Sequence, residues 1–172
     1  MKKPIFLCGF MAAGKSTIGK NLAERLGFAF ADTDEEISRQ AGMSVPQFIS
    51  EYGFKQFRRM ERDILSRLAC GAEIIISCGG GLYPTSATSH IFSKGTSIFL
   101  DVPEEILAKR ILDNLTAYPK FAKYSSENAV RQEIGRLLAH RRIFYERCQI
   151  KIPCVSATPE AVADMIAGRV GL

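Results

Sequence analysis

The sequence lacks any hydrophobic run that approaches the ~20 apolar residues of a membrane-spanning helix. It has only two histidines, and its five cysteines form no C-x-x-C pair and no metal-ligand spacing to either histidine. It also contains no internal repeat, no low-complexity tract and no interdomain linker. These absences argue against a membrane protein and against a disulfide framework, and we expect free, reduced thiols in a cytoplasmic protein.

The amino terminus has two lysines followed by an apolar run over residues 4–13, which superficially resembles a signal peptide. The run continues without a spacer into Gly14, Lys15 and Ser16, so cleavage would destroy the strongest motif of the chain. We therefore expect no signal peptide.

The length of 172 residues suits one domain, spanning residues 1–172, with a substantial core. Hydrophobic residues make up 47% and charged residues 24%, as in ordinary globular proteins. The net charge of +5 would suit nucleic acid, a membrane surface or a small anionic substrate. The positions of the basic residues must decide among these partners.

Short apolar runs alternate with longer amphipathic segments, a pattern typical of a largely parallel sheet with helical connections. The expected strands are residues 4–8, 28–31, 74–78, 97–101 and 149–155. The expected helices are residues 15–26, 35–41, 45–52, 54–70, 103–112 and 127–148, with a last helix that begins at Pro159. Because most of the strands are apolar throughout, we expect a three-layer α/β/α fold with a five-stranded parallel sheet. The polar, proline-containing segment 113–126 predicts a mobile flap.

The segment Gly9–Ser16 satisfies the phosphate-binding motif G-x-x-x-x-G-K-[ST] and lies between an apolar strand and a helix, as that motif requires. Its backbone N–H groups would surround phosphate oxygens, Lys15 would reach the β- and γ-phosphates, and the Ser16 hydroxyl would coordinate Mg²⁺. The chain is therefore expected to bind a nucleoside triphosphate. The expected nucleotide-binding residues of this loop are Met11, Ala12, Ala13, Gly14, Lys15, Ser16 and Thr17.

Two carboxylates follow the second strand, in the segment Asp32-Thr33-Asp34, at the edge where open α/β sheets bind ligands. Asp32 could belong to the magnesium shell, and Asp34 could accept a proton from an attacking hydroxyl. Alternatively, one of the two could simply cap the helix that starts at Glu35, and Asp34 is well placed for that too.

Two other features lie near that edge. Arg58 and Glu61, three residues apart on a helix, could be an ordinary surface ion pair. The glycine run Gly79–Gly81 follows the third strand, where it implies a close approach of the backbone to a ligand.

Taken together, these residues resemble the shikimate kinase family over nearly the whole chain. The resemblance is carried by Gly9-Phe10-Met11, Asp32-Thr33-Asp34, Gly53 with Phe57-Arg58 and Glu61, Gly79–Gly81, Arg110, and Arg141 with Tyr145.

The resemblance implies ATP-dependent phosphorylation of the 3-hydroxyl of shikimate in aromatic amino-acid biosynthesis, with Mg²⁺ and with Lys15 and Asp34 as catalytic residues. It implies that Arg58, Arg141 and the glycine run hold the anionic substrate, which would account for the basic charge without nucleic acid. It also places Arg110 and Tyr118 at the nucleotide, substrate-binding helices at about residues 33–61, and a lid at about 113–126. We expect the enzyme to be a monomer.

The chain departs from the family pattern at two positions. Phe54 replaces a glutamate that usually follows the glycine before the Phe-Arg pair, and Tyr118 replaces the arginine of an Arg-Pro pair in the lid. Lys120, Lys123 or Arg131 could supply the missing cation. Two alternatives remain open: a kinase for another small hydroxylated acid or polyol, and a catalytically impaired ATP-binding regulator. No N-K-x-D motif is present, which argues against a GTPase switch.

Overall fold

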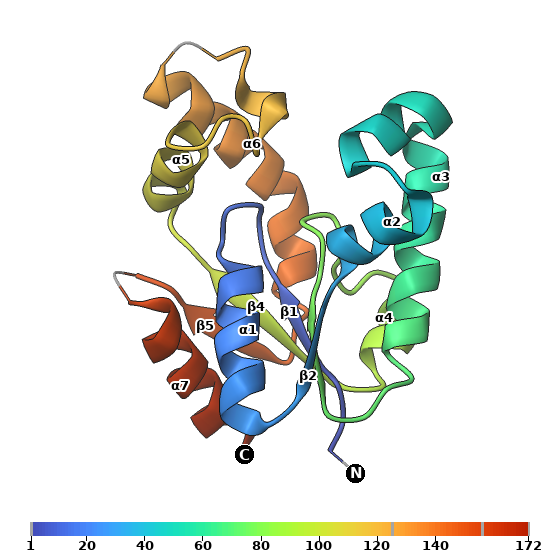
Figure 1. Ribbon diagram of the computed structural model, residues 1–172. Coiled ribbons are helices and arrows are strands. Elements are labelled where there is room, and N and C mark those ends of the chain that lie inside the picture. Colours follow the sequence, from blue (N-terminus) through green and yellow to red (C-terminus); the bar gives the residue numbers. More distant parts are fainter. Residues whose placement is uncertain (1, 125, 156, 172) are drawn as a thin grey trace.

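The computed structural model describes residues 2–124, 126–155 and 157–171 of the chain. The strands of this part are β1 (Ile5–Cys8), β2 (Ala29–Asp32), β3 (Ile74–Ser77), β4 (Thr96–Asp101) and β5 (Ile150–Pro153). Its helices are α1 (Lys15–Leu26), α2 (Thr33–Ala41), α3 (Val45–Leu68), α4 (Ser89–Phe92), α5 (Glu104–Leu112), α6 (Glu127–Tyr145) and α7 (Pro159–Val170), with a 3₁₀ helix η1 (Pro119–Phe121). Figure 1 shows the predicted layered α/β architecture.

The five strands form one parallel sheet in the order β2-β3-β1-β4-β5. In its register Leu7 and Asp32 both pair with Ser77, and Cys8 pairs with Phe99. The carboxyl ends of β2, β3 and β1 therefore lie side by side. The loops that follow these three strands carry most of the polar motifs of the sequence, so the sheet brings them to one edge.

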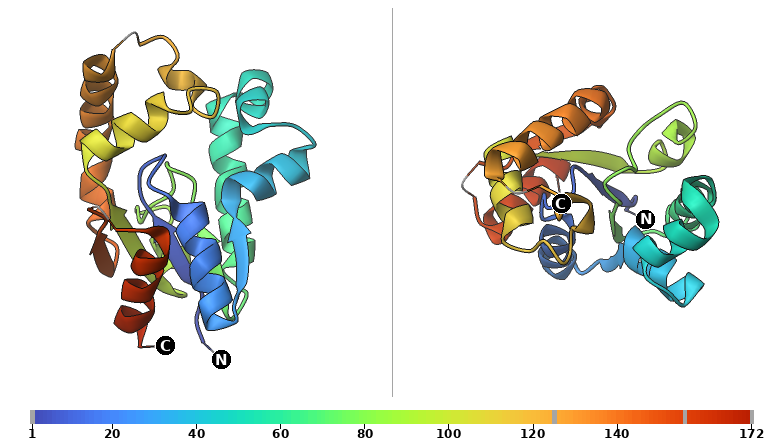
Figure 2. Two further views of the ribbon diagram at one scale, coloured as in Figure 1. Left: turned by 60° about the vertical axis from the view of Figure 1, so that its left-hand side comes forward. Right: turned by 90° about the horizontal axis from the view of Figure 1, so that it is seen from above.

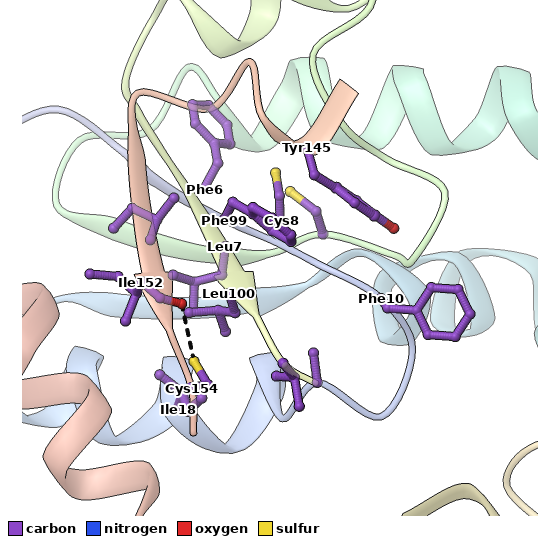
Figure 3. Packing of buried hydrophobic residues seen from close by; sticks show 14 of the residues in the cluster. Phe6, Leu7, Cys8, Phe10, Ile18, Phe99, Leu100, Tyr145, Ile152 and Cys154 are labelled. Carbon is purple, nitrogen blue, oxygen red and sulfur yellow. Dashed lines mark hydrogen bonds between the residues drawn. The ribbon is translucent and has the colours of Figure 1, made fainter. Parts of the chain in front are cut away.

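Alternation of side chains along the strands fills both faces of the sheet. Leu7 and Leu100 point toward Ile18 of α1, whereas Phe6 and Phe99 lie on the face that Tyr145 of α6 covers (Figure 3). Helices α1 and α7 pack together on the first face, and α6 and α4 lie across the second (Figure 2). This two-sided burial explains why the strands are apolar throughout.

Helix α2 begins two residues earlier than predicted, because Asp32 caps it. The Asp32 Oδ1 atom accepts hydrogen bonds from Asp34 N (2.9 Å) and Glu35 N (3.4 Å). The alternative in which Asp34 is the cap is therefore wrong. Asp32 is the last residue of β2 and Asp34 lies in α2, so the two carboxylates belong to different elements.

The two helices predicted on either side of Gly53 are the two halves of α3. Gly53 has φ 79° and ψ 164°, which no helix allows, so the predicted break is confirmed. Other boundaries shift by a few residues: α6 ends at Tyr145 rather than at residue 148. The short helices α4 and η1 have no counterpart in the sequence prediction because they are too short to show a period.

The predicted flap, residues 113–126, connects α5 to α6 and lies above the carboxyl edge of the sheet, opposite α2 and α3 (Figure 1). Phe121 anchors it, since this side chain is 0% exposed within the main core. Ser125 of this segment lies outside the described residues. No helix in the described part of the chain is both long and apolar enough to cross a bilayer.

Candidate active site

The phosphate-binding loop connects β1 to α1 and places Gly14 at the amino terminus of that helix. Ala12 (φ 61°) and Gly14 (φ 89°) adopt left-handed conformations, which turn the loop back on itself. Lys15 Nζ donates to the carbonyl oxygens of Gly9 (3.0 Å) and Phe10 (2.9 Å). Burial lowers the pKa of Lys15, while the nearby carboxylate of Asp34 opposes that shift. The lysine is thus folded along the loop, and its Nζ lies close to Asp34.

Two neighbouring cavities meet at the loop. One, of about 310 Å³, lies between Arg110 of α5 and the segment that leads into α7, and includes Ala157 and Pro159. The other, of about 260 Å³, contains Lys15 and extends to the ends of β2 and β3. Four residues line both cavities, namely Ala12, Gly14, Thr17 and Tyr118. Their shared wall gives the site a nucleoside-sized space joined to a polar space at the sheet edge.

Three oxygen-bearing side chains converge below the second cavity. Ser16 Oγ donates to Asp32 Oδ2 (2.6 Å) and lies 3.4 Å from Ser77 Oγ. Asp32 and Ser77 are buried, and the Asp32 Oδ1 atom is used by the cap of α2. Hydroxyl and carboxylate oxygens are the donors that Mg²⁺ prefers, and one carboxylate together with phosphate oxygens is a usual set for it. The donor set therefore fits Mg²⁺.

Asp34 lies between the phosphate-binding loop and the acceptor side of the cleft. Burial raises its pKa, and the neighbouring Asp32 raises it further, while Lys15 and Arg58 act in the opposite direction. A half-buried carboxylate with two cations beside it can stay ionised and accept a proton from a hydroxyl held between them.

Arg58 and Glu61 form an ion pair on α3, and the reading of this pair as a surface contact is wrong. Glu61 is only 1% exposed, and burial raises its pKa to about 7 although Arg58 lowers it. Asp34 and Arg141 also influence this pKa. Glu61 therefore belongs to the charged cluster of the site, where it holds the Arg58 guanidinium at the wall of the cleft.

The glycine run after β3 has no room for side chains. A Cβ on Gly79 would lie 2.6 Å from Asp34 Oδ1, and one on Gly81 would lie 2.7 Å from the guanidinium carbon of Arg58. A Cβ on Gly80 would lie 3.2 Å from the backbone nitrogen of Met11. The run thus contacts the aspartate, the arginine and the phosphate-binding loop at once, as the expected close backbone approach requires.

Hydrogen bonds with side chains of two helices, α2 and α6, hold this run. Thr33 Oγ1, which is buried at the start of α2, accepts from Gly79 N (2.7 Å). From α6, Arg141 Nη1 (3.0 Å) and Tyr145 Oη (2.7 Å) both donate to the carbonyl oxygen of Gly80. The Arg141 guanidinium also lies over the ring of Phe10, 5.7 Å from its centroid.

The lid side of the site contributes an arginine and a tyrosine. Arg110 Nη1 donates to the carbonyl oxygen of Ala12 (3.0 Å), and Tyr118 borders both cavities. Three cations lie in or beside the lid, and each of them has another partner in this structure. Lys120 pairs with Glu133 (3.7 Å), Arg131 pairs with Glu105 (2.6 Å), and Lys123 lies over the ring of Tyr124.

All the residues predicted for the site lie around this one edge of the sheet. The sequence prediction assigned no role to Thr33 and Ser77. A signal was available for both, because each is a polar residue at the carboxyl end of a strand, next to a motif already recognised.

A phosphate-binding loop, an adjacent carboxylate and an arginine-lined cleft on a parallel sheet of this order define a P-loop phosphotransferase. The family model described as shikimate kinase matches residues 11–170. The chain belongs to the shikimate kinase family.

Curated relatives agree over nearly full length. The chain is 33% identical to the shikimate kinase of Aquifex aeolicus over 172 residues, covering 97% of this chain and 96% of that one. It is 39% identical to the shikimate kinase of Chlorobium phaeobacteroides over 159 residues, covering 88% and 79% of the two chains.

Solved structures agree as well. The shikimate kinase of Bacteroides thetaiotaomicron superposes with a TM-score of 0.90 at 26% identity, covering 99% of both chains. The shikimate kinase of Acinetobacter baumannii, solved in complex with shikimate, superposes with a TM-score of 0.89 at 26% identity, covering 99% of this chain and 93% of that one. The five-stranded fold of the present chain is that of these kinases.

Proposed function

We propose that this chain transfers the γ-phosphate of ATP to the 3-hydroxyl of shikimate, with Mg²⁺, as a step of aromatic amino-acid biosynthesis. The observation that carries the proposal is the place of Asp34, which lines the same cavity as Lys15 of the phosphate-binding loop. Asp34 also lies against Gly79 of the glycine run, whose Gly81 lies against Arg58. A hydroxyl bound at Asp34 would therefore face the end of a phosphate chain bound in the loop.

The nucleotide would lie across the two joined cavities. Its phosphates would bind the N–H groups at the start of α1, and Lys15 would leave the carbonyl oxygens of Gly9 and Phe10 for the β- and γ-phosphates. Arg110 and Tyr118 would border the adenosine part, and the segment 113–126 would close over it and exclude water. Ser16 and Asp32 would hold Mg²⁺, which neutralises phosphate charge when bound.

The acceptor would bind between α3, α6 and the glycine run. Arg58 and Arg141 would pair with its carboxylate, a geometry that a guanidinium fork suits. Asp34 would orient the reacting hydroxyl and take its proton as the phosphoryl group is transferred. The Gly79–Gly81 backbone would complete the pocket, since its lack of side chains lets Asp34 and Arg58 lie directly against it.

The test is an assay of ADP formation from ATP and Mg²⁺, with and without shikimate and with a neutral polyol as the competing acceptor. Turnover should require shikimate, and Arg58→Leu should raise its KM at least about tenfold because a charged hydrogen bond to the carboxylate is lost. The matched control is Arg59→Leu, which removes an exposed arginine whose partner is Asp63 (4.0 Å). Turnover that is independent of shikimate, or equal with the polyol, would contradict the proposal.

A further inference from the structure

The three consecutive glycines after β3 need external anchors, because a glycine backbone has more conformational freedom than any other. Gly79 is held on both sides: its N–H donates to Thr33 Oγ1 (2.7 Å), and its carbonyl accepts from Leu82 N (2.8 Å). Gly80 is held only through its carbonyl oxygen, by Arg141 and Tyr145. Within the described ranges, the N–H groups of Gly80 and Gly81 have no hydrogen-bond partner in the protein.

Tyr145 is the more rigid of the two anchors. It is the last residue of α6 and is 0% exposed, with its ring stacked on Phe99 (centroids 5.1 Å apart, 13° between planes) and edge-on to Tyr83 (5.2 Å, 84°). Figure 3 shows this ring over Phe99, with its hydroxyl pointing away from the core. Burial raises the pKa of Tyr145, so the hydroxyl stays protonated and remains a donor.

Fixing the carbonyl of Gly80 also fixes the next N–H group. The peptide unit between Gly80 and Gly81 is planar and trans, so the Gly81 N–H points in the direction opposite to the Gly80 carbonyl. The carbonyl faces Arg141 and Tyr145 of α6, so the N–H points away from these two side chains. It is a donor without a partner in the protein, next to the Arg58 guanidinium.

Arg141 cannot serve as a permanent anchor if it also binds the acceptor. Its guanidinium is half-buried and lies between the Gly80 carbonyl and the ring of Phe10, so an anionic ligand would compete for its N–H groups. Tyr145 has no such competing role, because its side chain is buried and its single O–H proton is already used on the Gly80 carbonyl. When the acceptor engages Arg141, Tyr145 would be the remaining protein group on the Gly80 carbonyl.

We infer that Tyr145 is a positioning residue for the acceptor site: its hydroxyl holds the Gly80–Gly81 peptide so that the Gly81 N–H donates to the bound acceptor. This inference rests on the proposed function. It assigns Tyr145 a role in substrate binding beyond packing α6 onto the sheet.

The test is Tyr145→Phe, which keeps the stacked ring and removes only the hydroxyl. The KM for shikimate should rise about fivefold to tenfold, the effect of one lost hydrogen bond, with kcat and the KM for ATP unchanged. The control is Tyr83→Phe, a tyrosine of the same aromatic cluster whose hydroxyl makes no hydrogen bond within the described residues. In isotope-labelled protein, the shift of the Gly81 amide on shikimate addition should be reduced in Tyr145→Phe and intact in Tyr83→Phe.

Each outcome decides the inference. An unchanged shikimate KM, or equal increases in the KM values for ATP and shikimate, would overturn it and leave Tyr145 as a packing residue. Thermal unfolding is measured on the same variants. A Tyr145→Phe protein with a lower unfolding midpoint but unchanged kinetics would also show that Tyr145 serves only in packing. If the unmodified chain shows no shikimate-dependent ADP formation, the proposed function fails and the inference fails with it. If the unmodified chain is active but Tyr145→Phe leaves the shikimate KM unchanged, only the inference fails.

Discussion

Three carboxylates at one sheet edge differ in role because their surroundings differ. One carboxylate oxygen of Asp32 accepts the hydrogen bond that caps α2, and the other accepts from the Ser16 hydroxyl, so both oxygens are held in place. Asp34 is half-buried with Lys15 and Arg58 beside it and keeps an oxygen toward the cleft. Glu61 is fully buried against Arg58. Residue type alone does not distinguish these three, whereas burial and partners do.

The substitution Asp34→Asn tests the proposed role of Asp34 as the group that takes the hydroxyl proton. It should lower kcat by about 10²- to 10⁴-fold, the usual contribution of a positioned proton acceptor, because an amide cannot take the hydroxyl proton. ATP affinity, measured by calorimetry, should be nearly unchanged. The matched control is Glu35→Gln at the next position, an exposed side chain that pairs only loosely with Lys20 (3.9 Å). A kcat loss of less than tenfold for Asp34→Asn would argue for another base.

Glu61 should make the unfolding free energy depend on pH. Its folded pKa of about 7 lies above the ordinary glutamate value of 4.5, so the folded protein binds the proton more tightly than the unfolded chain does. The resulting stability is fully present below pH 4.5 and is lost as pH rises through about 7. The full effect is on the order of 3 kcal/mol.

Chemical denaturation between pH 5 and 8 measures this effect. The unfolding free energy of the unmodified chain should fall with rising pH more steeply than that of Glu61→Gln, which cannot titrate. Glu133→Gln is the control, because the hydrogen bond from Arg136 lowers the pKa of Glu133 to about 2, outside the window. Parallel curves for the unmodified chain and Glu61→Gln would show that the Glu61 pKa is close to its ordinary value.

At the scale of elements, the break in α3 sets where its second half points. Gly53 separates the capped first half, which begins after Ser44, from the half that carries Arg58 and Glu61. A continuous helix would send these two side chains in another direction, since each residue adds about 100° of rotation. The glycine is therefore part of the site geometry although it lies outside the cleft.

Two glycine-to-alanine substitutions should change stability in opposite directions. Neither Gly53 nor Gly168 has any atom within 4 Å of an added Cβ, so steric contact does not distinguish them. Gly53→Ala should destabilise by about 1–3 kcal/mol because φ 79° with ψ 164° is strained for alanine. Gly168→Ala lies inside α7 and should stabilise by about 0.5–1 kcal/mol.

The measurement is thermal unfolding of the two variants beside the unmodified chain. Each kcal/mol should shift the midpoint by roughly 2–4 °C for a chain of this size. Shikimate KM should rise in Gly53→Ala, where Arg58 is displaced, and stay constant in Gly168→Ala. An unchanged midpoint for Gly53→Ala would mean that the two halves of α3 can be joined by a backbone conformation that alanine adopts without strain.

At the scale of the whole molecule, the proposed nucleotide site is built from parts that are distant in sequence. The two cavities are lined by the phosphate-binding loop, by Arg110 and Tyr118 of the lid side, and by residues that precede and begin α7. A ligand that binds all of these only in the folded state must stabilise the entire domain.

Mg²⁺ with ATP should therefore raise the midpoint of thermal unfolding. At a concentration of about 100 Kd the stabilisation is about 2.7 kcal/mol, which corresponds to roughly 5–10 °C. ATP with a chelator should give a smaller shift because Ser16 and Asp32 lose the ion between them and the phosphates. Equal shifts with and without the metal would contradict the magnesium site, and adenosine serves as the control without phosphates.

The strands, most of the helices and the phosphate-binding loop were predictable from sequence because each depends on local information. Apolar runs, a glycine motif and a break at Gly53 act over a few neighbouring residues. The candidate site was also largely predictable, since its motifs stand at strand ends and the carboxyl ends of parallel strands share one edge. The boundary of α2 was not, because the competition between Asp32 and Asp34 for its cap depends on backbone geometry.

By itself, then, the sequence determined that a phosphate-binding loop opens a helix on a parallel sheet with an acidic and glycine-rich edge. Only the tertiary structure decided the partners across that edge. The pairing of Arg58 with Glu61 is local, but the burial of Glu61 depends on the packing around α3. The two donors from α6 on the Gly80 carbonyl join residues that are 61 and 65 positions apart. Such pairings depend on how helices pack across the sheet, which no local pattern specifies, and they turn a nucleotide-binding loop into one side of a two-substrate cleft.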